Sequence, residues 1–180
     1  ENTFKTKEKS SITNKTITSY LGYIEDAFLI QTAERFDIKG RKYIGANKKY
    51  YFTDTGLRNA RLNFRQIEES HIMENVIYNE LKLRGYNVDV GVVEYNSKDS
   101  NGKSKKNQLE CDFVANLGNE KIYIQVSDNI TDEKTFEREV SPLLKIKDAY
   151  PKMIIARTRH DEYQYEGVKV VDVADWLMRQ

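Results

Sequence analysis

The chain has 180 residues, with 29 Lys/Arg against 28 Asp/Glu, and 39% of its residues are hydrophobic. This length and composition predict a soluble globular protein with one domain, or one domain and a small module. No segment resembles a signal peptide or a membrane span, so we expect a cytoplasmic protein that makes no membrane contact.

Cysteine and histidine are scarce, with Cys111 as the single cysteine beside two histidines. A lone cysteine argues against a disulfide framework and for a reducing compartment. The same scarcity argues against a zinc site. The chain starts at Glu1 with a polar, lysine-rich stretch, so we interpret it as a piece of a longer protein.

Charge is distributed unevenly along the chain. Residues 1–64 hold 12 Lys/Arg against 7 Asp/Glu, whereas residues 65–180 hold 17 against 21. The basic surplus at the front fits an anionic partner. A solvated basic face explains it about equally well.

The front of the chain predicts a helix followed by two strands. From Thr13, apolar residues recur at helical spacing as far as Phe28, and Thr13 or Asn14 is a plausible N-cap. Strand-like runs follow at 29–37 and 42–53, joined by a basic turn at 39–42. A helix followed by a two-stranded wing with a basic tip is typical of a winged helix.

The candidate nucleic-acid contacts of this front module lie on the polar face of the helix and at the tip of the wing. They are Lys15, Ser19, Lys39, Arg41 and Lys42. We expect the basic tip to lie near DNA phosphates. The alternative is that the module only docks onto the rest of a larger chain. We place the boundary after residue 64, so that residues 1–64 form the linker remnant and winged-helix-like module.

Residues 65–180 predict a second, mixed α/β domain. Residues 67–84 have the strongest helical pattern, and Gly85 is suited to end that helix. Glu74 lies inside this helix in its apolar zone, where a carboxylate must be paired or at the rim. Strands at 88–95, 153–156 and 168–173, a polar loop at 96–107 and helices after 131 and near 175 complete the expected sheet with helices on its faces.

A hairpin at residues 108–127 carries the most informative polar pair. Two short apolar runs flank a Gly-Asn turn, and their alternation lets Asp112 and Gln125 lie on one side of adjoining strands. Glu110 shares a face with Asp112. Such a pair indicates a metal or phosphate site, unless these faces simply point to solvent.

The order helix, strand, strand, strand, helix, strand, with Glu74, Asp112 and Gln125 at these places, resembles the restriction-endonuclease-like fold of the PD-(D/E)XK nucleases. That resemblance implies a catalytic set of Glu74, Asp112 and Gln125, with Glu74 and Asp112 holding Mg²⁺ or Mn²⁺. The family pattern has an acidic residue where this chain has Gln125 and a lysine where it has Ser127. An amide oxygen brings no charge to a metal, and a hydroxyl cannot replace an ammonium, so the resemblance implies a degenerate site.

The sequence also resembles a domain of unknown function that follows AAA-type ATPase modules in bacteria and archaea. The matching segments are 49–57, 73–81, 110–114 and 123–127. The front module would then be the winged-helix piece that links such an ATPase to its C-terminal domain. The resemblance implies that the ATPase module is a partner and that ATP binds only in that upstream part, because this chain has no intact phosphate-binding loop.

Three functions remain open from the sequence. The first is a degenerate nuclease-like domain that binds nucleic acid or serves as a scaffold in an ATPase-linked protein. The second is a divalent-metal-dependent DNase that uses Glu74, Asp112 and Gln125. The third is a protein-interaction module. The sequence does not indicate the oligomeric state.

Overall fold

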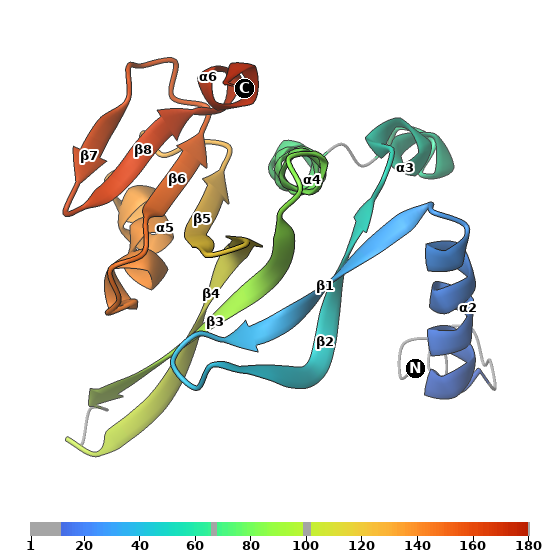
Figure 1. The fold of residues 1–180 in the computed structure, drawn as a ribbon, viewed down its shortest axis with the longest axis horizontal. Coiled ribbons are helices and arrows are strands. Elements are labelled where there is room, and N and C mark those ends of the chain that lie inside the picture. The colour runs from blue at the N-terminus through green and yellow to red at the C-terminus, as the bar shows by residue number, and fades with distance from the viewer. Residues whose placement is uncertain (1–11, 66–67, 99–101, 180) are drawn as a thin grey trace.

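One mixed sheet organises the molecule. A computed structural model describes residues 12–65, 68–98 and 102–179. Its eight strands follow the order β2-β1-β3-β4-β5-β6-β8-β7, with helices against the sheet (Figure 1). The expected α/β class, a large mixed sheet flanked by helices, is confirmed. No helix in the described ranges is long and apolar enough to cross a membrane.

The front of the chain forms a helix and a hairpin, as expected. They are α2 (Asn14–Asp26), β1 (Ile30–Asp37) and β2 (Lys42–Phe52), followed by the short helix α3 (Thr55–Arg61). The Thr13 hydroxyl accepts from the Thr16 amide and caps α2.

The front hairpin is part of the main sheet. Strand β1 pairs antiparallel with β2 on one side. On its other side it pairs in parallel with β3 (Asn87–Lys98), from Arg35 opposite Val90 to Asp37 opposite Val92. The expected boundary after residue 64 falls between α3 and α4 (Glu69–Leu83), and the sheet runs across it. Side chains from both halves of the chain therefore meet on one sheet face.

The turn between β1 and β2 is held by a buried carboxylate. Asp37 Oδ1 accepts from the Gly40 amide at 2.9 Å, and Asp37 is 6% exposed. A Cβ on Gly40 would lie 2.3 Å from Asp37 Oδ2, so any larger residue there would displace the Asp37 carboxylate that holds the turn. Arg41 follows with φ of 52°, which makes the turn tight and its geometry specific.

Strand β3 and its partner β4 (Ser104–Leu117) form a long two-stranded arm that extends beyond the other strands (Figure 1). The ladder continues to Lys98 opposite Ser104. The prediction of a loop at 96–107 is therefore wrong for residues 96–98 and 104–107, which lie in the two strands. Residues 99–101 lie outside the described residues. Polar side chains do not prevent pairing here, because both faces of the arm meet water while the backbone ladder is satisfied.

A bulge bends the sheet beside the polar pair of the hairpin. The β3–β4 register shifts between Asp89 and Gly91. A Cβ on Gly91 would lie 2.9 Å from Cys111 Cβ, so the strands approach closely at this point. An extra residue on one strand re-aims the side chains around it, and the bulge lies next to Asp112.

The sheet packs helices on both faces. On one face, α4 covers a core that includes Tyr78 and Phe113, with the Tyr51 and Tyr78 rings stacked 4.0 Å apart. On the other face, α5 (Glu133–Lys145) covers a core that includes Cys111 and Leu143. The remaining elements are β5 (Glu120–Ser127), β6 (Lys152–Ala156), β7 (Tyr163–Tyr165), β8 (Val168–Asp172) and α6 (Val173–Met178).

Candidate functional site: a lysine among three carboxylates

The site begins where β4 and β5 part. Their ladder starts at the turn and ends with Phe113 opposite Ile124. Beyond it, Val126 N donates to Asp112 Oδ2 at 2.9 Å, and Asp112 N donates to Gln125 Oε1 at 3.3 Å. Two side chains thus take over the role of ladder carbonyls as the strands separate. This arrangement explains why a buried carboxylate and amide are tolerated inside an apolar hairpin.

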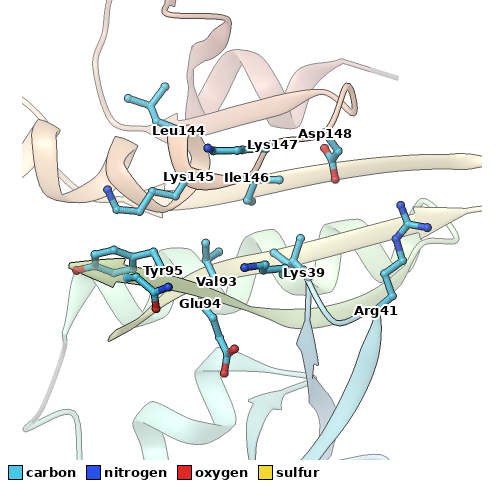
Figure 2. Close-up of a pocket in the computed structure, with 12 residues that line it drawn as sticks. Lys39, Arg41, Val93, Glu94, Tyr95, Leu144, Lys145, Ile146, Lys147 and Asp148 are labelled. Carbon is cyan, nitrogen blue, oxygen red and sulfur yellow. The ribbon is translucent and has the colours of Figure 1, made fainter. Parts of the chain in front are cut away.

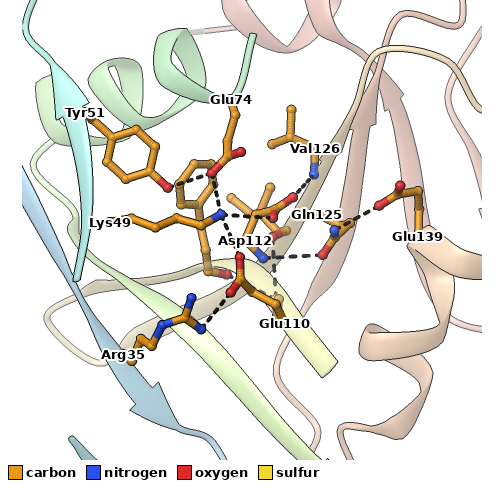
Figure 3. A network of polar contacts seen from close by, with 12 residues as sticks. Arg35, Lys49, Tyr51, Glu74, Glu110, Asp112, Gln125, Val126 and Glu139 are labelled. Atoms are coloured by element: carbon orange, nitrogen blue, oxygen red, sulfur yellow. Dashed lines mark hydrogen bonds and ion pairs between the residues drawn. The ribbon is translucent and has the colours of Figure 1, made fainter. Parts of the chain in front are cut away.

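Lys49 of β2 lies at the centre of the site (Figure 3). Its Nζ is 2.8 Å from Glu74 Oε1, 2.7 Å from Glu110 Oε1 and 3.8 Å from Asp112 Oδ1. The Lys49 side chain is 26% exposed, and those of Glu74 and Asp112 are 16% and 12% exposed. The ammonium therefore bridges α4 and β4 in a largely desolvated place, where its attraction for carboxylates is strong.

Further groups complete the network around the lysine. Tyr51 OH donates to Glu74 Oε1 at 2.7 Å, and Arg35 Nη1 lies 2.7 Å from Glu110 Oε2. On the far side of the strand split, Gln125 Nε2 donates to Glu139 Oε2 of α5 at 2.9 Å. Gln125 is thus fixed between the Asp112 backbone and a second buried carboxylate.

The charges favour one proton within the cluster. Glu74, Glu110 and Asp112 face the two cations Lys49 and Arg35. Burial, and then the charge of Glu74, raise the pKa of Asp112 to about 8, against the opposing effect of Lys49. A neutral Asp112 would balance the remaining two carboxylates against the two cations.

The pKa values of the other two groups fit the same picture. Burial tends to lower the pKa of Lys49, but the charge of Glu74 and the hydrogen bonds to Glu110 and Glu74 outweigh it and raise that pKa above its ordinary value. Burial tends to raise the pKa of Glu110, but hydrogen bonds and charges from Lys49 and Arg35 outweigh it and lower that pKa. Lys49 is therefore a permanent cation of the site.

The residues present do not fit Mg²⁺ or Mn²⁺ with Lys49 in its place. A divalent ion needs oxygen ligands at about 2.0–2.2 Å on an unobstructed side, and the lysine ammonium already contacts the carboxylate oxygens. In the described ranges, no group of three or more His, Cys, Asp or Glu is arranged to hold a metal. Ser127 stands where the nuclease pattern has a lysine, and its hydroxyl donates to the Asn129 carbonyl at 3.2 Å.

The structure brings together the expected residues Glu74, Asp112 and Gln125, which lie around the point inside β4 where its ladder with β5 ends. Sequence reasoning missed Lys49, Tyr51 and Glu139 as members of the same network. Lys49 and Tyr51 are two residues apart on a strand, so a shared face was readable from the sequence. That this face meets α4 was not, because it depends on the parallel pairing of β1 with β3.

The expected nucleic-acid residues fall into two separated groups. Lys39, Arg41 and Lys42 lie at the β1–β2 turn, and the first two line a cleft described below. Lys15 and Ser19 lie on α2, which packs at the opposite end of the hairpin, where Leu29 N donates to the Ile24 carbonyl (Figure 1). The structure does not bring these two groups to one surface.

The fold and network define a mixed α/β protein with a buried lysine–carboxylate site. Residues 2–68 match the model of a domain of unknown function, DUF8612. An uncharacterised protein of Haemophilus influenzae is 34% identical over 174 residues, which cover 97% of this chain and 40% of that protein. An uncharacterised protein of Methanocaldococcus jannaschii is 30% identical over 167 residues, covering 92% of this chain and 34% of that protein.

The chain thus spans 40% or less of the length of these relatives. No solved structure matches it.

Proposed function

We propose that the chain is the C-terminal part of an ATPase-linked protein, and that its nuclease-like domain binds nucleic acid or serves as a scaffold without metal catalysis. In this proposal, residues 65–180 form a degenerate restriction-endonuclease-like domain. The helix α2 and the β1–β2 hairpin form the winged-helix segment before it.

The observation that carries the proposal is the position of Lys49. Its ammonium lies 2.7–3.8 Å from three carboxylate oxygens, at the place where the nuclease pattern would hold a cation. An ammonium neutralises the carboxylates as a metal would, but it cannot coordinate and activate water. The site then stabilises the fold and leaves phosphodiesters intact.

Two features support the nuclease-like ancestry. The carboxylates come from the helix α4 and from β4, and β4 separates from β5 next to Asp112. On β5, the Gln125 side chain is held by the Asp112 amide and by Glu139, and it does not face Lys49. A once-acidic position turned into a structural amide is consistent with a site that no longer binds metal.

The ATPase link is supported by the relatives' lengths and by the family resemblance. The matched region covers 40% of the Haemophilus influenzae protein, so the larger part of that protein lies outside it. That part has room for a nucleotide-hydrolysing module, where ATP would bind. The α/β domain of this chain would then act as the nucleic-acid-binding or scaffolding end of the larger protein.

A cleavage assay tests the proposal. Wild type and Asp112→Ala are incubated with supercoiled plasmid and with single-stranded DNA in Mg²⁺ or Mn²⁺. We expect no cleavage by either protein. Metal-dependent cleavage by wild type that disappears in Asp112→Ala would overturn the proposal.

The same lysine supports a second candidate, a metal-dependent DNase. Lys49 brings an ammonium close to Asp112, which Ser127 cannot do. Such a cation stabilises the negative charge on a phosphoryl group. In this alternative, Lys49 would have to move off the carboxylates before a metal could bind. Wild-type cleavage that is lost in both Lys49→Ala and Asp112→Ala would favour it.

A further inference from the structure

A cleft lies away from the lysine–carboxylate site, between the β1–β2 turn and the end of α5 (Figure 2). It has a volume of about 560 Å³. One wall is formed by Lys39, Arg41 and β3 residues 93–96, and the other by residues 144–148. Pockets of this size hold small molecules or one or two units of a polymer.

The cleft is basic on both walls. Lys39 and Arg41 lie on one wall, and Lys145 and Lys147 lie on the other. Among the described residues, Lys39, Arg41 and Lys147 form no ion pair. Unpaired cations that converge on one cleft attract an anionic ligand.

The two carboxylates of the cleft are engaged elsewhere. Glu94 lies 2.7 Å from Lys106 Nζ and accepts from Gln108 Nε2. Asp148 accepts from Tyr123 OH at 2.6 Å. Lys106 balances the charge of Glu94, whereas Asp148 keeps its charge. Four cations then face one unbalanced carboxylate, so the cleft keeps a net positive charge.

The cleft also offers apolar and aromatic surface. Val93 and Ile146 are buried beneath it. The Tyr95 ring lines the cleft, with Lys145 Nζ 4.7 Å from its centroid. An aromatic face beside cations is the combination on which proteins hold a base and its neighbouring phosphate.

The wall that carries Arg41 is preorganised. Asp37 and Gly40 fix the turn, as described above, and Ile38 N donates to the Val92 carbonyl at 3.1 Å. A rigid turn loses little conformational freedom when a ligand binds.

The geometry points to single-stranded nucleic acid as the ligand of this cleft, with phosphates on the rim cations and a base against Tyr95. A duplex hides its base faces and is too wide for a cleft of this volume. The β3–β4 arm extends the track, since the exposed Lys105 lies opposite Ser97, two residues beyond Tyr95 and on the same face of the arm. The inference rests on the nucleic-acid part of the proposed function and names its site and ligand class.

Fluorescence anisotropy with a labelled oligothymidylate tests this inference. Arg41→Ala with Lys147→Ala removes one cation from each wall. Its matched control is Arg61→Ala with Lys134→Ala, which removes the same two side-chain types from exposed places elsewhere. Tyr95→Leu keeps the bulk of the side chain and removes the aromatic face.

The cleft variant is expected to bind roughly tenfold more weakly than wild type, with a salt dependence shallower by about 1.4, because each single-strand phosphate contact contributes about 0.7. The control variant should bind as wild type does. Tyr95→Leu should weaken oligothymidylate binding but leave binding of heparin, which has no bases, unchanged. A duplex of the same length should bind more weakly than the single strand.

Four results would overturn the inference. Equal losses of oligothymidylate affinity in the cleft and control variants would mean that only net charge matters. Duplex binding as tight as single-strand binding would mean that the cleft is not the binding site. Unchanged binding in the cleft variant, with normal wild-type affinity, would end this inference while the proposed function stood. If wild type showed no salt-sensitive binding, both this inference and the nucleic-acid role in the proposed function would be wrong. Only the scaffold role would then stand.

Discussion

Lys49 Nζ lies 2.8 Å from Glu74 Oε1 and joins the front hairpin to the long helix α4. The two residues lie on opposite sides of the expected boundary after residue 64, which the continuous sheet crosses. Lys49 therefore comes from the segment before that boundary, and the three carboxylates come from the segment after it. The site exists only when the hairpin is paired into the main sheet.

Lys49→Met should destabilise the protein by about 2–4 kcal/mol, because it leaves buried carboxylates without their cation. Its neighbour gives a matched control: Lys48 pairs with Glu34 at 2.9 Å, but both side chains are about half exposed. Lys48→Met should cost less than about 1 kcal/mol. Urea unfolding measures both, and equal losses in the two variants would contradict a structural role for Lys49.

The raised pKa of Asp112 predicts a specific pH dependence. The folded state holds the Asp112 proton more tightly than the unfolded chain, so this contribution to stability is complete below the ordinary aspartate pKa. It is lost as the pH rises through about 8. Asp112→Asn keeps an acceptor for Val126 N and does not titrate.

Between pH 5 and pH 8.5, the free energy of unfolding of Asp112→Asn should therefore rise relative to wild type by about 2–4 kcal/mol. Urea unfolding at both pH values measures this change, with the exposed Asp161→Asn as the control. If Asp112→Asn and wild type changed in parallel with pH, Asp112 would be ionised throughout and the charge balance of the site would be different.

Gln125→Glu introduces the acidic residue that the nuclease pattern has at this position, and we expect it to destabilise the fold. The new carboxylate would face Glu139, which now accepts from Gln125 Nε2 at 2.9 Å. Loss of the donor and the added repulsion should cost about 1–3 kcal/mol at neutral pH. Gln164→Glu, on the exposed strand β7, should cost little.

Unfolding by urea at pH 7 and at pH 5 compares the two glutamate variants. The penalty of Gln125→Glu should shrink at the lower pH, because protonation restores a donor toward Glu139. A Gln125→Glu protein as stable as wild type at both values would show that Gln125 is not a structural amide.

The sequence indicated the α/β class, the hairpin and the positions of Glu74 and Asp112 because these follow from local periodicity. Lys49 was missed for a physical reason: its role depends on the pairing of Arg35–Asp37 with Val90–Val92, which no local pattern encodes. The ends of the β3–β4 arm were missed because polar residues such as Asn96 and Lys106 give no alternation of hydrophobicity, while their backbones pair. Glu139 was missed as well, although α5 turns it toward Gln125.

The central claim is that the Lys49 ammonium takes the place of a metal ion among Glu74, Glu110 and Asp112. Thermal unfolding with increasing Mn²⁺ tests it most directly, using wild type, Lys49→Ala and the control Lys48→Ala. A ligand that binds the folded state raises the melting temperature. Once the ammonium is gone, the three carboxylates can close around an ion, so we expect Mn²⁺ to raise the melting temperature of Lys49→Ala by about 3–6 °C and to leave the other two proteins unchanged. Stabilisation of wild type by Mn²⁺ as large as that of Lys49→Ala would contradict the claim.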